Sequence, residues 1–170
     1  SNEEFSEFLA NILLFGRMME QCSIKDIKRE IRRVAMNHLS RREYTRHELV
    51  VRLNERFESP EDVQEVVENL IFKGLQSDRR FTESFIRYRI QKGFGPIRIR
   101  KELQERGVEE KLSTASLEVF ELDWERNATE VLDKKFGKTV CEDFKEIAKR
   151  ARFMEHRGFS LEHCQKRLNL

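Results

Sequence analysis

Basic side chains recur along the chain in three blocks, and the chemistry that they could support is the binding of anionic groups. Residues 25–56 hold ten basic and five acidic residues, residues 79–108 nine and three, and residues 134–170 ten and five. The stretches between these blocks are acidic. We expect contacts with a partner or with nucleic acid from thirteen exposed basic residues: Arg41, Arg42, Arg46, Arg87, Arg89, Lys92, Arg98, Arg100, Lys101, Lys149, Arg150, Arg152 and Arg157.

The same charges have a simpler interpretation, in which helix faces are solvated and neighbouring segments neutralise one another through weak surface pairs. Both interpretations fit a net charge of only +2. Where the basic residues do bind, Arg98, Arg100 and Lys101 favour contact with phosphates or an acidic protein surface. Sequence-specific base reading is disfavoured because Asn and Gln are scarce around them.

No pattern typical of an enzyme accompanies these charges. The GxxxxGK[ST], HExxH and GxSxG motifs are absent. The Gly93-Phe94-Gly95 segment lacks the preceding strand and the third glycine of a dinucleotide-binding turn. We therefore expect a protein that is not an enzyme and that uses no cofactor and no small-molecule substrate.

The cysteines and histidines do not indicate a metal site or a disulfide framework. The chain has three cysteines, without CxxC spacing. His156 and His163 lie near Cys164, which would be compatible with a metal ligand set. Cys164 occupies a position that is apolar in similar segments of the chain, so we interpret it as a small core residue and expect no metal.

The basic residues must be positioned by short helices, which are clearest in residues 77–108. Phe81, Phe85 and Tyr88 recur at i, i+4 and i+7, which is one face of a helix, and Asp78 is its expected N-cap. A second helix should follow at once, with Ile99 and Leu103 as its apolar stripe. Four residues are interpreted as structural residues of the turns around this second helix: Gly93, Gly95, Pro96 and Gly107.

This two-helix corner occurs three times, which indicates an internal repeat. In each copy an aromatic residue (Tyr44, Phe94 or Phe159) precedes an N-cap candidate. Apolar residues lie five and nine positions after the aromatic residue. Thr45 with Glu48 forms the pattern of a capping box. We predict an all-α fold of tandem three-helix repeats in an elongated, curved array. The predicted parts are an N-terminal helix (1–24), repeat 1 (25–76), repeat 2 (77–122) and repeat 3 (123–170), which lacks a third helix after its corner.

The N-terminal segment is apolar and acidic. Apolar residues recur at helical spacing (Phe5, Phe8, Leu9, Ile12 and Met19) among several glutamates. We favour packing of this stripe on repeat 1, and the alternative is an arm that docks a partner or a second copy. The uninterrupted apolar run 12–15 is too short to span a membrane, and no basic-then-apolar leader opens the sequence, so we expect a cytoplasmic protein.

Three motifs, in order, resemble those of the bacterial RecX family. Residues 39–49 (LSRREYTRHEL) are similar to the family's opening motif. The central signature is matched by Gly74-Leu75, Asp78, Phe81 and the segment 93–96 (GFGP), with Thr82 in place of the family's usual small residue. Phe153 with residues 157–159 (RGF) matches the C-terminal signature. The resemblance runs from about residue 31 to the end of the chain.

The resemblance implies modular three-helix repeats and a role as a regulator of the recombinase RecA. Proteins of this family associate with RecA filaments on DNA and limit filament growth, ATP hydrolysis, strand exchange and co-protease activity. The expected partner is therefore a RecA filament, with direct DNA contact possible and no membrane involved. Two alternatives stay open: a nucleic-acid-binding protein that acts without RecA, and a scaffold whose basic blocks meet an acidic protein.

Overall fold

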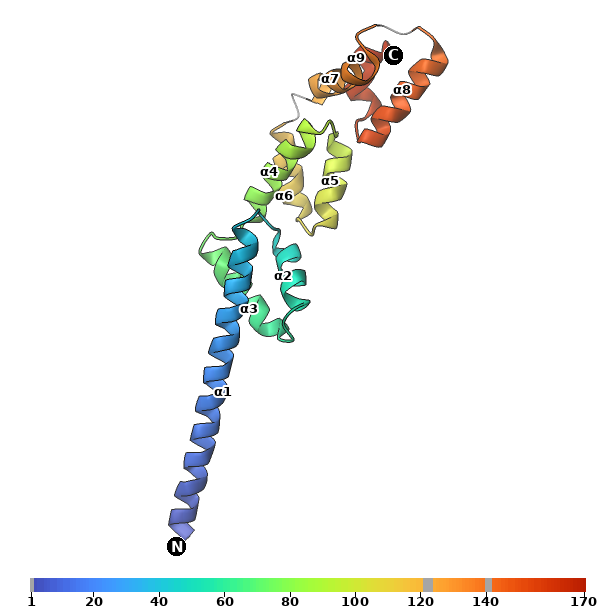
Figure 1. Ribbon diagram of the computed structural model, residues 1–170. Helices are drawn as coiled ribbons and strands as arrows, with labels where there is room; N and C mark the ends of the chain where they lie inside the picture. Colours follow the sequence, from blue (N-terminus) through green and yellow to red (C-terminus); the bar gives the residue numbers. More distant parts are fainter. Residues whose placement is uncertain (1, 121–123, 140–141) are drawn as a thin grey trace. The chain divides into compact units, whose positions relative to one another are not determined.

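A computed structural model of the protein describes residues 2–120, 124–139 and 142–170 (Figure 1), with side chains from Ile12 onward except those of Glu20 and Cys22. The described residues form helices and no strand, which confirms the predicted all-α fold. In chain order the helices are α1 (Asn2–Leu39), α2 (Arg46–Asn54), α3 (Pro60–Phe72), α4 (Asp78–Gln91), α5 (Pro96–Glu105), α6 (Glu110–Glu118), α7 (Trp124–Phe136), α8 (Phe144–Arg157) and α9 (Leu161–Leu168).

The helices form two compact units, Ser1–Gln76 with α1 to α3 and Ser77–Leu170 with α4 to α9. Consecutive triplets of helices thus follow the predicted three-helix pattern. In the last triplet the corner lies between α8 and α9, and α7 supplies the third helix before the corner. The boundaries drawn at residues 24 and 76 stay predictions, and the one at 122/123 lies outside the described residues.

The first unit has its own core, in which Ile31 of α1, Leu49 of α2 and Val67 of α3 are fully buried. Thr45 caps α2 with the predicted capping box. Its side chain accepts a hydrogen bond from the backbone amide of Glu48, and the Glu48 side chain accepts one from the backbone amide of Thr45. The Gln76 side chain donates to the backbone carbonyl of Tyr44 at 3.0 Å. This hydrogen bond joins the end of the unit to its corner.

Helix α1 runs through residue 24 without interruption, so the N-terminal segment and the first helix of repeat 1 are one helix (Figure 1). Its core residues begin at Ile31. Ile12 and Met19 are exposed, at 51% and 59%, so the favoured interpretation that this stripe packs on repeat 1 is wrong for them. The side chains of Phe5, Phe8 and Leu9 lie outside the described part of the chain.

The second unit has one core shared by two predicted repeats. Phe81, Ile99 and Leu103 come from the α4–α6 segment, and Trp124 and Met154 come from the α7–α9 segment. All five side chains belong to a single buried cluster. Repeats 2 and 3 are therefore packed together rather than merely adjacent along the chain.

Local signals place most helix ends in this unit, with one correction. Gly93 follows α4 with φ of +76°, the left-handed conformation expected of a glycine past a helix end. Pro96 starts α5 at the first helical position, as predicted. The N-cap of α4 is Ser77, whose hydroxyl accepts from the amide of Arg80 at 3.3 Å, and the expected cap Asp78 is the first helical residue.

Candidate nucleoprotein-binding surface

Three of the predicted contact arginines surround the ring of Phe94. The guanidinium carbons of Arg89, Arg98 and Arg157 lie 3.9, 4.4 and 5.0 Å from the ring centroid. Glu102 accepts hydrogen bonds from Arg89 and, at 3.0 Å, from Nε of Arg98. Each guanidinium is thus held by a cation–π contact, and two of them share a carboxylate.

Two of these arginines also join the corner of repeat 2 to that of repeat 3. Arg98 Nη1 donates to the carbonyl oxygen of His156 at 3.2 Å, and Arg157 Nη1 donates to that of Lys92 at 2.9 Å. The second bond satisfies a carbonyl at the C-terminal end of α4, where helices leave acceptors unpaired. Arg98 and Arg157 therefore position the two corners, whatever else they contact.

Three side chains predicted to be exposed are half-buried instead. Arg89 retains 17% of its side-chain exposure and Arg150 12%, and Arg157 is also half-buried. Arg150 pairs with Glu146 at 3.4 Å, and its guanidinium lies over the ring of Phe136. The prediction of exposure is wrong for these residues because their long side chains cover apolar rings while their charges find local partners.

Other predicted contacts are exposed but paired. Arg42 lies 3.2 Å from Glu48 and over the ring of Tyr44, and Arg46 lies 2.6 Å from Glu68. Two exposed lysines of the predicted set also have a partner: Lys149 lies 3.2 Å from Glu146, and Lys92 lies 5.6 Å from the ring centroid of Tyr88. These cations are accessible, and a partner would have to compete with their present contacts.

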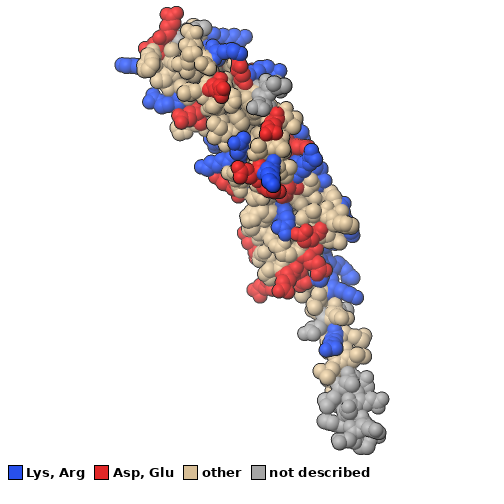
Figure 2. All heavy atoms as spheres, turned by 180° about the vertical axis from the view of Figure 1, so that it is seen from behind, with Lys and Arg blue, Asp and Glu red and all other residues tan. Residues whose placement is uncertain are grey.

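Five predicted contacts are exposed and make no side-chain hydrogen bond or ion pair within the described ranges: Arg41, Arg87, Arg100, Lys101 and Arg152. Arg100 and Lys101 are neighbours on α5. On the face shown in Figure 2, basic and acidic side chains are interspersed rather than gathered into one patch. Unpaired cations such as these are therefore a better guide to an anionic partner than the total charge.

A basic pocket of about 590 Å³ lies in the second unit between the end of α4, α7 and α8. Lys92 and Arg157 line it from the predicted set. Lys134 and Lys135 line it as well; they are not among the predicted contacts, although a doubled lysine is a visible signal. Arg126 Nε lies 3.6 Å from Glu130 on its rim. The pocket could hold a phosphate or a carboxylate group.

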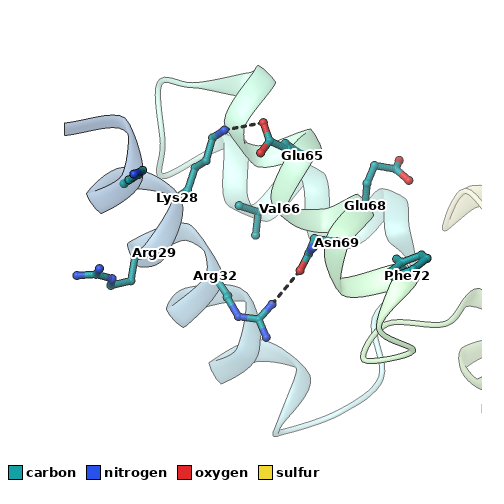
Figure 3. A pocket seen from close by; sticks show the side chains of 9 residues that line it. Lys28, Arg29, Arg32, Glu65, Val66, Glu68, Asn69 and Phe72 are labelled. Carbon is teal, nitrogen blue, oxygen red and sulfur yellow. Dashed lines mark hydrogen bonds and ion pairs between the residues drawn. The ribbon is translucent and has the colours of Figure 1, made fainter. Parts of the chain in front are cut away.

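A groove of about 660 Å³ lies in the first unit between α1 and α3 (Figure 3), and we call it the α1–α3 groove. Lys28 points toward Glu65 with its Nζ 2.6 Å from the carboxylate, and Arg32 toward Asn69. The hydrogen bond that Lys28 donates to Glu65 raises the pKa of its amine. Phe72 borders the groove and is 89% exposed. The lining mixes positive charge with exposed apolar surface.

Two of the residues considered as metal ligands, Cys164 and His163, have other roles. Cys164 is buried, and burial raises the pKa of its thiol to about 11. Nδ1 of His163 accepts from the amide of Ser160 at 3.2 Å, so this ring is part of the cap of α9. Across the described parts of the chain no group of three or more His, Cys, Asp or Glu side chains could hold a metal ion. Cys22 and Cys141 lie outside the described side chains.

Comparison with known families matches most of the second unit. Residues 77–117 match the family model for RecX, second three-helix domain, and residues 123–168 match that for RecX, third three-helix domain. The chain is 37% identical over 139 residues to the regulatory protein RecX of Pseudomonas fluorescens, covering 82% of this chain and 90% of the relative. It is 43% identical over 131 residues to that of Chromohalobacter salexigens, covering 77% and 86%.

Solved structures share the fold. The crystal structure of RecX from Lactobacillus salivarius matches with a TM-score of 0.72 at 20% identity, over 85% of this chain and 96% of that one. A second crystal structure, of a regulatory protein RecX, matches with a TM-score of 0.73 at 20% identity, over 87% and 74%. None of the described helices is long and apolar enough to cross a membrane.

Proposed function

The chain belongs to the RecX family, and from this premise we propose that it regulates the recombinase RecA by binding RecA filaments on DNA. Binding would limit filament growth and, with it, ATP hydrolysis, strand exchange and co-protease activity. The proposed regulator acts without catalysis, cofactor or small-molecule substrate, in the cytoplasm where RecA works. Steric occupation of a filament by packed helices would suffice for this effect.

The observation that carries the proposal beyond the family is the set of cations without partners in the second unit. Arg87, Arg100 and Lys101 expose charge that no described neighbour neutralises. The basic pocket adds Lys134 and Lys135 on the same unit. A nucleoprotein filament offers phosphates and acidic side chains, and charge-assisted contacts with either are stronger than neutral ones.

A second candidate function is nucleic-acid binding without RecA, which the basic pocket favours. Its five cations could hold a backbone phosphate without reading the bases: Lys92 just after α4, Arg126, Lys134 and Lys135 of α7, and Arg157 of α8. Such binding would weaken steeply with salt, by nearly one unit of logarithmic slope for each phosphate contacted. It would need no recombinase.

RecA's ATP hydrolysis on single-stranded DNA separates the two functions when the protein is added far below the RecA concentration. The filament proposal predicts strong inhibition at this ratio, because one bound regulator would stop growth of a whole filament. An absence of inhibition at equal concentrations, combined with tight binding to bare DNA, would support the second function instead. The mixture should be assayed at two salt concentrations so that competition for DNA is recognised by its salt dependence.

A further inference from the structure

Residues 12–19 of α1 expose apolar side chains on almost every side of the helix. Six large side chains between 51% and 68% exposed lie within two turns of helix: Ile12, Leu13, Leu14, Phe15, Met18 and Met19. The unit's own core begins about 18 Å further along the helix, at Ile31. A continuous apolar surface of this kind marks an interaction site, because soluble proteins rarely leave one uncovered.

Gly16 lies in the middle of this apolar segment. A Cβ at this position would meet nothing within 4 Å. Glycine inside a helix costs about 1 kcal/mol relative to alanine, so the unit's own packing gives no reason for it. A missing side chain does permit another backbone to approach closely.

Opposite charges flank the apolar segment along the same helix. Residues 3–7 include three glutamates, about 11 residues before Gly16. Lys25, Lys28 and Arg29 are centred about 11 residues after it and border the α1–α3 groove with the exposed Phe72 (Figure 3). Asp26 lies among them, 3.5 Å from Arg29, and Lys28 lies 2.6 Å from Glu65, so a second copy would compete with these pairs for a segment whose net charge is +2. The acidic and basic segments are thus equally distant from Gly16, at about 16 Å each.

We propose that two copies of the chain pair through α1 in antiparallel orientation and cross near Gly16. The apolar segments 12–19 of the two copies then cover each other. The acidic segment 3–7 of each copy lies along the basic segment 25–29 of the other, beside the α1–α3 groove. A parallel pair would instead bring the two acidic segments together, which their repulsion disfavours.

The complementary charge is carried by the chain itself, which is why the proposal commits to a second copy. An acidic amphipathic partner could use the basic segment, but it would leave residues 3–7 unmatched. An antiparallel pair satisfies both charged segments of both copies at once. Its interface is self-complementary, as two-fold symmetric interfaces must be.

Sedimentation velocity of the full chain from about 1 to about 100 µM tests the pairing, because a dimer's population depends on concentration. We expect a monomer–dimer equilibrium that the double variant Phe15→Glu, Met18→Glu removes with unchanged helicity by circular dichroism. The matched control is Phe144→Glu, which alters a phenylalanine that is 80% exposed outside α1. A wild-type monomer throughout this range, or a dimer that survives Phe15→Glu, Met18→Glu, would overturn the proposal.

A charge exchange tests the orientation. One variant carries Lys25→Glu and Arg29→Glu, and the other carries Glu3→Lys and Glu7→Lys. Each should dimerise at least about tenfold more weakly than wild type, and an equimolar mixture should recover the wild-type affinity. Parallel pairing predicts no loss in either variant alone, so wild-type dimerisation by both would refute the antiparallel arrangement. These measurements contain no RecA and do not depend on the proposed function.

Discussion

The backbones of Gly95 and Gly158 lie against each other, 63 residues apart in the chain. A Cβ on Gly95 would lie well under 3.0 Å from the carbonyl oxygen of Gly158. The amide of Gly95 donates to the carbonyl of Arg157 at 2.8 Å, and that of Ile97 donates to Gly158 at 3.0 Å. Two corners with the same sequence pattern therefore pack back to back, and their contact joins repeats 2 and 3.

Gly158→Ala should destabilise the second unit by about 2–4 kcal/mol, from left-handed strain and overpacking together. Gly158 has φ of +86°, and its Cβ would overlap Arg98. Gly137→Ala is the matched control, because Gly137 has φ of +80° with nothing within 4 Å. Urea unfolding followed by fluorescence of Trp124 measures both variants. Equal losses of stability in the two variants would show that the close contact of Gly158 with Arg98 contributes nothing to the free energy of unfolding.

Gly95→Ala isolates the contact from backbone strain. Gly95 has φ of −92°, which alanine adopts readily, so its substitution tests only the overlap with Gly158 and Phe159. We expect a loss of about 1–3 kcal/mol in the same unfolding experiment. Any effect on RecA regulation should follow the fraction of folded protein, and full stability in Gly95→Ala would contradict the close packing described here.

Sequence patterns of a few neighbouring residues predicted the helix ends at the corners. They could not predict the contacts between residues that are far apart in the chain. The capping box of Thr45 and the left-handed Gly93 follow from a few neighbouring residues. The sequence predicts a structural role for Gly95 in its own turn, whereas the close contact that requires a glycine there is with the backbone of another repeat. The bond from Arg98 to His156 spans 58 residues, so no local pattern shows that Arg98 is partly engaged in the fold.

Lys101→Glu should weaken inhibition of RecA's DNA-dependent ATP hydrolysis, raising the half-inhibitory concentration about fivefold or more, because it puts a negative charge where an anionic partner would bind. Lys111→Glu on α6 is the matched control, an exposed lysine of the same unit that makes no described ion pair. Arg98 is less suitable because its substitution would also break the bond to His156. Equal inhibition by both lysine variants and wild type would remove α5 from the interface.

The first unit should lose stability as the pH falls below about 6.5, through His38. Burial, followed by the charges of Arg52, Arg41, Arg42 and Arg56, lowers the pKa of His38 from its ordinary 6.5. Between the folded-state pKa and about 6.5, the folded protein therefore keeps His38 neutral while the unfolded chain takes up a proton. The stability contributed by the neutral ring is present above pH 6.5 and is lost as the pH falls toward the folded-state pKa.

His38→Phe tests this pH dependence, because it keeps an aromatic ring at the edge contact with Tyr44 and removes the titrating group. Far-UV circular dichroism during urea unfolding at about pH 7.5 and about pH 5.5 gives the comparison. Wild type should lose more stability than the variant between these two values. Parallel losses would assign the pH dependence to other groups.

The thiol of Cys164 should be unreactive in the folded protein. Its pKa of about 11 leaves little thiolate near pH 8, and the side chain is buried against the core of the second unit. Iodoacetamide should therefore modify Cys164 only after unfolding, as mass spectrometry of its peptide would show. Labelling of the native protein at the unfolded rate would contradict the core position of this residue.

The unbroken course of α1 has a mechanical consequence. No proline, turn or break separates the exposed Phe15 from the buried Ile31, about 24 Å further along the helix. The helix therefore acts as one rigid rod that is anchored in the core of the first unit. A force applied to residues 12–19 would therefore be transmitted through the helix to the packing around Ile31. Because Tyr44 belongs to the same core, the corner at Tyr44 would be affected directly.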